Sequence, residues 1–228
     1  QSVSLKLLVE REMQIESFNS EEYWSIEVLF KIESKETLTS KLFLFDNKKI
    51  EKMTIQSQQE ANNTCSIIKN NVFIAGSINS TPKNRNPAPP FMTSTLQQES
   101  SRKLGLATKE TMMTAQRLYE AGLITYMRTD GIDMAPEAIK NVRSLIKEMF
   151  GNSYAPQSPR IYKNASKNAQ EAHECIRPTD INLIPRKLPE LDKLQSGLYK
   201  LIWNRTVSSQ MESAKFEATS VEIMNKEK

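Results

Sequence analysis

Apolar and polar residues follow two different periods along the chain, and the change of period predicts where its strands and helices lie. Residues 3–16 have the spacing of a short, highly charged amphipathic helix. Over residues 23–32 the period is two, which is typical of a half-buried strand. Further strands are predicted over 41–45 and over a hairpin, 65–69 and 72–75, that turns at Asn70-Asn71. The first part of the chain is therefore predicted to be β-rich.

Residues 81–90 contain four prolines and are predicted to break any helix or central strand, which marks a domain boundary. After them the helical period dominates, and Thr95 with Gln98 forms a capping-box pattern. Helices are predicted from this pattern to Gly105, over 109–121, over 136–150 and over about 190–210. Residues 151–169 are polar and predicted to be a loop. Residues 216–224 are predicted to be extended and to return to the β-rich unit.

The amino-acid composition indicates how many domains the chain can form and which classes of protein it excludes. A chain of 228 residues with 38% hydrophobic residues allows one or two domains with an ordinary core. Charged residues make up 25% and leave no run of 18 apolar residues, so no transmembrane helix is predicted. Cys65 and Cys175 form neither a disulfide framework nor a metal knuckle, which favours a reducing, cytoplasmic setting. The sequence starts without methionine, so we expect a fragment of a longer protein.

Candidate chemistry lies first in residues 122–131, an extended run between two predicted helices. Side chains at i and i+2 of an extended chain share a face, so Tyr126 and Arg128 are predicted to point the same way. A tyrosine hydroxyl is a weak nucleophile at neutral pH, but a nearby guanidinium favours the phenolate and binds a phosphate with two donors. The alternative is an ordinary half-buried aromatic residue beside a surface charge.

The second candidate is the run from Gln170 to Asp180, which contains the one histidine of the chain, His173. His173-Glu174 resembles the start of a zinc-protease HExxH motif, but Arg177 stands where the second histidine would be, so that interpretation is excluded. With one histidine, no His-rich metal site is predicted in this chain. A lone histidine near an arginine can contact a phosphate oxygen or move a proton. A purely structural histidine would give the same pattern.

Together these segments resemble the type IA DNA topoisomerases, and bacterial DNA topoisomerase I in particular, from residue 1 to residue 228. The resemblance rests on long motifs in the same order. They are Gln1-Ser2-Val3 with Glu10-Arg11-Glu12, Glu22-Tyr23-Trp24, the run from Pro90 to Gln98, the run from Ala115 to Asp130, and the run from Glu171 to Asp180.

The resemblance implies an α+β fold in which a β-rich arch domain joins a mainly helical domain, both parts of a toroidal enzyme. Residues 1–18 would be a helix at the end of the neighbouring base domain. Residues 19–86 would form the first part of the arch, and residues 213–228 would return to it. Residues 87–212 would form the helical domain that carries the nucleophilic tyrosine.

The resemblance also implies an activity that needs no ATP. The tyrosine matching Tyr126 would attack one DNA strand, leaving a 5′-phosphotyrosine link and a free 3′-hydroxyl. The other strand would pass through the gap before resealing, which relaxes negative supercoils. Arg128 would hold the scissile phosphate, and His173 would contact a backbone phosphate. Arg177 would be a supporting or DNA-contacting residue.

Partners follow from the same resemblance. The family binds Mg²⁺ through an acidic cluster in an N-terminal Toprim domain, which lies outside this chain, and no metal ligands are assigned within it. Single-stranded or negatively supercoiled DNA and the Toprim domain are the expected partners, with no membrane. The expected location is the cytoplasm, in association with the nucleoid. Without the Toprim domain, we expect this chain alone to neither cleave nor relax DNA.

One position departs from the pattern of the family, which usually continues Thr-Asp with serine where this chain has Gly131. Glycine permits positive φ, so we expect a looser turn after the tyrosine. Two alternatives stay open. The chain could belong to a related type IA enzyme, topoisomerase III or reverse gyrase. It could also be a noncatalytic single-stranded-DNA-binding module that retains the motifs.

Overall fold

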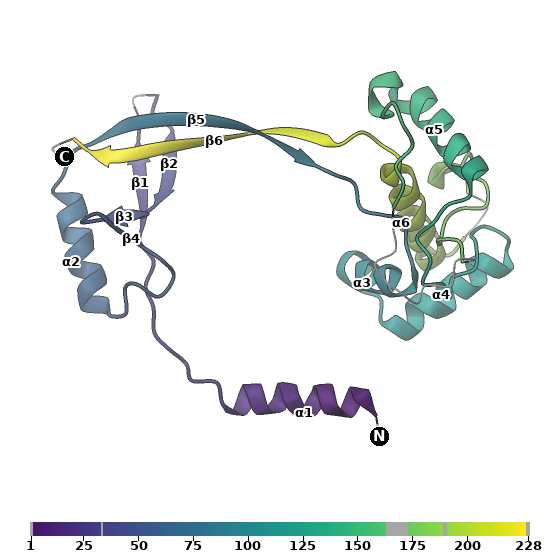
Figure 1. Cartoon of the computed structure of the whole chain (residues 1–228), viewed down its shortest axis with the longest axis horizontal. Helices are drawn as coiled ribbons and strands as arrows, with labels where there is room; N and C mark the ends of the chain where they lie inside the picture. Colours follow the sequence, from purple (N-terminus) through teal and green to yellow (C-terminus); the bar gives the residue numbers. More distant parts are fainter. Residues whose placement is uncertain (1, 33, 163–172, 189–190, 227–228) are drawn as a thin grey trace. The chain divides into compact units, whose positions relative to one another are not determined.

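The computed structural model describes residues 2–32, 34–162, 173–188 and 191–226. The chain divides into two compact units, which are residues 1–79 with 220–228, and residues 80–219. The first contains small two-stranded sheets and two helices, and the second is mainly helical (Figure 1). This mixture confirms the predicted α+β class.

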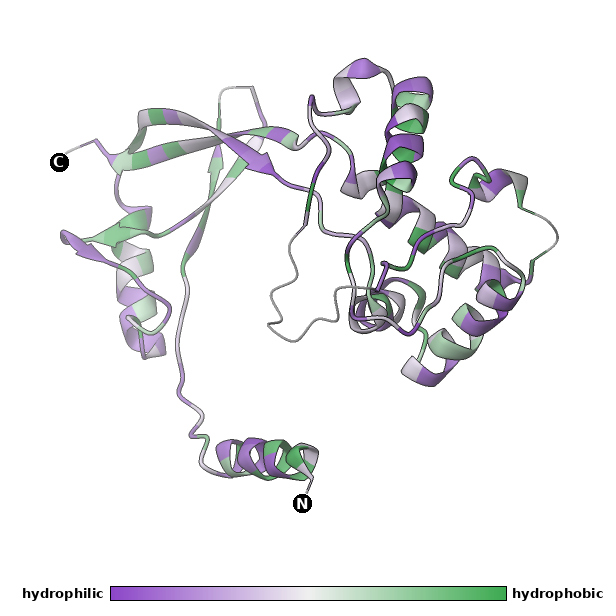
Figure 2. Ribbon diagram, turned by 45° about the vertical axis from the view of Figure 1, so that its right-hand side comes forward, coloured by the Kyte–Doolittle hydropathy of each residue, from purple (hydrophilic) through white to green (hydrophobic). Residues whose placement is uncertain are grey.

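The first unit has a small core of its own. Its elements are α1 (Val3–Glu16), β1 (Glu27–Lys31), β2 (Thr37–Lys41), β3 (Leu44–Phe45), β4 (Lys48–Lys49) and α2 (Gln58–Lys69). Strand β1 pairs antiparallel with β2, and β3 with β4. Ile26, Ile55 and Ala61 are buried at the centre of this core. Helix α1 has the predicted bounds but buries none of its residues, and hydrophobic and hydrophilic residues both lie along it (Figure 2).

The predicted hairpin at residues 65–75 is wrong, because residues up to Lys69 belong to α2. Its second strand is confirmed for residues 73–75, which begin β5 (Phe73–Arg85). The side chain of Ser57 accepts a hydrogen bond from the Glu60 amide and so caps the start of this helix. Ala61 and Thr64, three residues apart, are then buried on one face of the helix. A stretch as short as residues 65–68 is too brief to show a clear period, so the cap upstream is the local signal that favours a helix.

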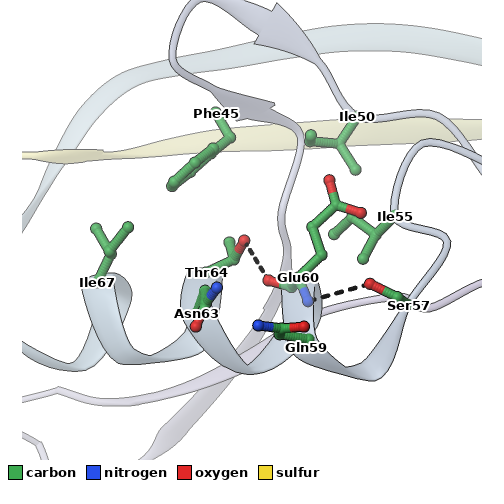
Figure 3. Close-up of a pocket in the computed structure, with 9 residues that line it drawn as sticks. All are labelled: Phe45, Ile50, Ile55, Ser57, Gln59, Glu60, Asn63, Thr64 and Ile67. Atoms are coloured by element: carbon green, nitrogen blue, oxygen red, sulfur yellow. Dashed lines mark hydrogen bonds between the residues drawn. The ribbon is translucent and has the colours of Figure 1, made fainter.

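A pocket of about 450 Å³ lies beside α2 in this unit (Figure 3). Phe45, Ile50, Ile55 and Ile67 supply its apolar side chains. The hydrogen bonds drawn there belong to α2 itself, because the Thr64 hydroxyl donates to a carbonyl one turn earlier and Ser57 forms the cap. None of the predicted site residues lines this pocket.

Two long strands, β5 (Phe73–Arg85) and β6 (Ala214–Asn225), pair with each other. Strand β6 confirms the extended conformation predicted for residues 216–224. The predicted break is wrong for residues 81–85, since β5 runs through Pro82. Both strands of a two-stranded ribbon are edge strands, where a proline need not remove a ladder hydrogen bond. Side chains also join the strands, because Ser77 Oγ donates to Glu222 Oε2 at 2.8 Å.

The second unit packs its helices around one apolar core. Its elements are α3 (Thr93–Leu104), α4 (Thr108–Glu120), α5 (Pro136–Phe150), η1 (Asn152–Tyr154), η2 (Pro185–Lys187) and α6 (Lys193–Ser209). The predicted helices are confirmed, and Gly105 and Gly122 follow α3 and α4 in left-handed conformations with φ of 69° and 71°. Thr95 lies inside α3 rather than at its cap, which is Met92. The core includes Leu96, Leu118, Ile146 and Ile202, one residue from each of these α-helices.

Arg205 of α6 fixes the segment that enters this unit. Its guanidinium carbon lies 4.3 Å from the centre of the Phe91 ring, and Nη1 donates to the Pro89 carbonyl at 3.3 Å. Glu99 of α3 lies 3.7 Å from the other terminal nitrogen. Burial lowers the pKa of Arg205 from its ordinary value, and the carboxylate of Glu99 opposes that shift. Arg205 thus contacts both the ring of Phe91 and the backbone of Pro89, near the Phe91 carbonyl that accepts a hydrogen bond from the Ile176 amide.

Candidate functional site

Residues 122–131 lie in the connection between α4 and α5 and carry the predicted nucleophile. Met127 is 1% exposed and belongs to the core, whereas Tyr126 on one side of it is 48% exposed and Arg128 on the other side is exposed. Thr129 is again buried. The alternation places Tyr126 and Arg128 on the solvent side of the segment, as the extended pattern predicts.

Thr93, the first residue of α3, holds this segment from one side. The first amide groups of a helix have no partner within it, and the Thr93 amide donates to the Thr129 carbonyl at 2.9 Å. The Thr93 hydroxyl accepts from the Thr129 amide at 2.9 Å. The same hydroxyl lies 2.8 Å from the Met127 carbonyl and 3.0 Å from that of Thr129, so its proton is shared between them. The backbone is therefore fixed on both sides of Arg128.

Thr125 holds the segment from the other side and connects it to the histidine motif. Its hydroxyl donates to the Cys175 carbonyl at 2.7 Å and accepts from the Arg177 amide at 2.9 Å. Its own amide donates to the Arg177 carbonyl at 2.9 Å. The Ile176 amide in turn donates to the Phe91 carbonyl at 2.8 Å. The two segments predicted to carry the chemistry thus lie side by side, although 50 residues separate them.

A partly buried clasp orders the histidine motif. Arg177 donates from Nε to Glu174 Oε1 at 2.7 Å and from Nη2 to Oε2 at 3.1 Å, and from Nη1 to the Pro178 carbonyl at 2.8 Å. Glu174 Oε1 also accepts from the Ala135 amide, directly before α5, at 3.0 Å. The Arg177 side chain is 16% exposed. These contacts favour the supporting role for Arg177, and its predicted contact with DNA stays a prediction.

His173 lies at the start of this clasp and is exposed. Its carbonyl approaches Gly131 so closely that a Cβ on Gly131 would lie 1.8 Å from the carbonyl oxygen. Gly131 is not among the glycines with positive φ, so the expected loose turn is wrong. Its amide donates to the Thr129 hydroxyl at 2.9 Å, and the residue is buried. Glycine is needed here for close approach and not for its backbone angles.

Tyr126 is half exposed and contacts one aromatic neighbour. The ring of Tyr119, in the last turn of α4, meets that of Tyr126 edge to face, with centroids 5.3 Å apart and planes at 66°. Among the residues that the structure describes, Arg128 forms no ion pair or hydrogen bond, so its guanidinium is available to a ligand. Burial raises the pKa of the Cys175 thiol to about 12, so this thiol stays protonated and does not compete as a nucleophile.

Sequence reasoning missed Thr93, Thr125, Tyr119 and Glu174. Each lies inside or beside a motif that the sequence singled out, but its partner is distant or depends on helix packing. The hydrogen bonds of Thr93 to the tyrosine segment, for example, join residues 34 and 36 positions apart. A threonine at a helix start normally indicates a local cap, and no local signal distinguishes that from a tertiary contact.

Neither a metal site nor a membrane span is found in the described part of the chain. No three His, Cys, Asp or Glu side chains among the described residues gather in a group that could hold a metal ion. No helix within the described ranges is long and apolar enough to cross a bilayer.

A hollow of about 320 Å³, lined in part by Arg177 and Asp180, lies where the start of α5 meets residues 177–181.

Comparison with known proteins gives one consistent result. A family model described as DNA topoisomerase matches residues 1–228. DNA topoisomerase 1 of Rickettsia bellii is 45% identical over 237 residues, covering 100% of this chain and 30% of the relative. That of Zymomonas mobilis is 46% identical over 227 residues, covering 98% of this chain and 18% of the relative.

A solved structure agrees with these relatives. The full-length topoisomerase I of Thermotoga maritima superimposes with a TM-score of 0.77 at 31% identity, covering 98% of this chain and 35% of that protein. The chain thus spans about a third or less of the length of the proteins it matches.

Proposed function

The chain belongs to the DNA topoisomerase family, and we propose that it supplies the strand-cleaving tyrosine, Tyr126, of a type IA enzyme. The observation that carries this proposal is the pinned segment around the tyrosine. Tyr126 and Arg128 are exposed on a backbone that Thr93 and Thr125 fix from two sides. A nucleophile held in this way reaches a bound phosphodiester without first ordering its own backbone.

The reaction exchanges one phosphate ester for another. The Tyr126 oxygen attacks the phosphorus, a bond from phosphorus to tyrosine forms, and the bond to the 3′-oxygen breaks. The phenol loses its proton and the leaving 3′-oxygen gains one, so charge and protons balance. The product carries a 5′-phosphotyrosine link and a free 3′-hydroxyl, which reverses the reaction by attacking the same phosphorus. No ATP is consumed, because the energy of the phosphodiester is kept in the phosphotyrosine.

Each neighbouring group has a distinct task in this proposal. Arg128, with no partner among the described residues, binds the scissile phosphate and stabilises charge that develops on its oxygens. His173 contacts a backbone phosphate of the same strand. Arg177 and Glu174 order the histidine segment through their paired hydrogen bonds. Tyr119 restricts the ring of Tyr126.

The complete protein would do more than this chain can. We assign residues 87–212 to the tyrosine domain and residues 19–86 and 213–228 to the arch, with residues 1–18 belonging to a base domain. The complete enzyme would pass the second strand through the break and relax negatively supercoiled DNA. As the resemblance to the type IA enzymes implies, Mg²⁺ would bind to a Toprim domain outside this chain. We expect the enzyme in the cytoplasm with the nucleoid.

The rival assignments make different predictions. The relatives named above are DNA topoisomerase 1 proteins, which favours that enzyme over topoisomerase III or reverse gyrase. A noncatalytic DNA-binding module would keep the fold and still bind single strands, but it would form no covalent link. Formation of an adduct through Tyr126 therefore separates the enzyme from the module.

The test is a denaturing-gel assay with a single-stranded oligonucleotide and Mg²⁺. It compares this chain alone, this chain with the separately expressed N-terminal segment, and the complete protein. One oligonucleotide is labelled at its 3′ end and another at its 5′ end. Only the 3′-end label should enter the covalent adduct, because the tyrosine would hold the 5′ phosphate of the downstream piece. This chain alone should give no adduct.

Two variants complete the test. Tyr126→Phe should abolish the adduct. Tyr154→Phe is the matched control, because this tyrosine of the same unit is 51% exposed, close to the 48% of Tyr126, and should leave the adduct unchanged. A complete protein that forms no adduct, or one whose adduct survives Tyr126→Phe, would overturn the proposed function.

A further inference from the structure

In this chain Gly131 joins the tyrosine segment to the histidine segment at a distance that leaves no room for a Cβ, although relatives of the family usually carry serine at this position. A Cβ at this position would lie 1.8 Å from the His173 carbonyl oxygen and 2.7 Å from the carbonyl carbon, whereas real Cβ contacts stay above 3.0 Å. Both of the obstructing atoms are backbone atoms, so turning a side chain cannot relieve the overlap. Any other residue at position 131 must move one of the two segments.

Hydrogen bonds hold the residues that flank this contact on both segments. Next to Gly131, Thr129 is held by the amide and the hydroxyl of Thr93. Next to His173, Glu174 accepts from the Ala135 amide, and the Cys175 amide donates to the Asp133 carbonyl at 2.8 Å. A displacement large enough to admit a methyl group therefore changes where His173 lies relative to Tyr126 and Arg128.

We propose that Gly131 is a positioning residue that sets the placement of His173 beside the Tyr126–Arg128 face, and so the phosphate contact made during strand cleavage. This inference rests on the proposed function. Gly131 itself has no side chain to touch DNA and acts only through the path of residues 173–177. It differs from the three glycines at positions 105, 122 and 151, which have positive φ and nothing within 4 Å of the place that a Cβ would occupy.

The test is a double-mutant cycle on the rate of covalent adduct formation by the complete protein. Gly131→Ala should slow cleavage about tenfold or more, as loss of a hydrogen bond to a charged group does. His173→Ala should slow it by a similar factor in the unmodified protein and by less than about twofold in the Gly131→Ala background, since the contact is already lost. Gly197→Ala is the matched control, because its Cβ would meet only Leu104 at ordinary distances of 3.7 and 3.9 Å.

A second readout reports the position of the imidazole directly. The 228-residue chain has one histidine, so its ring Cε1–H group gives a single NMR signal. Gly131→Ala should move this signal in the folded chain, and Gly197→Ala should not. Should Gly131→Ala fail to fold, Glu174→Gln serves in its place, because it weakens the clasp on the histidine segment without adding volume. It should reduce the effect of His173→Ala in the same way.

The outcomes are distinct. Cleavage by folded Gly131→Ala at the normal rate would overturn the inference, as would Gly131→Ala and His173→Ala effects that simply multiply. For the Glu174→Gln variant, an undiminished effect of His173→Ala would overturn it. Cleavage that survives Tyr126→Phe would instead contradict the proposed function, whatever Gly131 does.

Discussion

Replacement of Thr93 by valine removes one hydroxyl and keeps the size and branching of the side chain. That hydroxyl donates to the carbonyls of Met127 and Thr129 at 2.8 and 3.0 Å and accepts from the Thr129 amide at 2.9 Å. Thr129 is 7% exposed, so its amide cannot turn to water when the hydroxyl is lost. The Thr93 amide still donates to the Thr129 carbonyl, so the groups that lose the hydroxyl as their partner are the Thr129 amide and the Met127 carbonyl.

The expected loss of stability follows from the number of polar groups that lose their hydrogen-bond partner. A buried polar group left without a hydrogen bond costs about 1–3 kcal/mol, and the hydroxyl that is removed had itself been partly buried. We therefore expect Thr93→Val to lower the free energy of unfolding by about 1–3 kcal/mol. Thr93→Ser keeps the hydroxyl and loses one methyl group, so it should cost clearly less.

Tryptophan fluorescence during urea unfolding measures the free energy of unfolding of the second unit, which contains Thr93. There are two tryptophans, and Trp203 is buried in the second unit, where its Nε1 donates to the Ile181 carbonyl at 2.9 Å. In a Trp24→Phe background the signal comes from Trp203 alone. Stability of Thr93→Val within about 0.5 kcal/mol of the parent, the usual range for surface substitutions, would refute the reasoning. So would an equal loss in Thr93→Ser.

Two further predictions concern single side chains. Tyr119→Leu should slow adduct formation by up to about tenfold and Tyr119→Phe much less, because the edge contact with Tyr126 is worth about 0.5–1.5 kcal/mol and needs only the ring. Iodoacetamide at pH 9 should alkylate the half-buried Cys65 but not Cys175, as read by mass spectrometry, because burial raises the pKa of Cys175 from 9.0 to about 12. Since the unfolded thiol ionises first, stability should fall as pH rises from about 9 towards 12, and Cys175→Ala should reduce that fall.

Local sequence signals were sufficient to predict where the helices of the second unit begin and end. Left-handed glycines follow α3 and α4 where the sequence places them, and Pro136 begins α5. The first unit was harder to predict, because residues 65–69 are too few to distinguish a strand from the end of α2, and the Ser57 cap that starts this helix lies eight residues earlier. Pro82 likewise predicts a break, and only the pairing of β5 with β6 makes it an edge position.

By itself the sequence determined the helical period, singled out Tyr126 and Arg128 as a pair, and contained the motifs that identify the family. Those are properties of neighbouring residues and of their order. Only the tertiary structure decided that Thr93 and Thr125 hold the tyrosine segment, and that Gly131 admits the His173 carbonyl. Hydrogen bonds and close approaches between residues 34 to 52 positions apart depend on how the helices pack, and packing is a property of the whole unit.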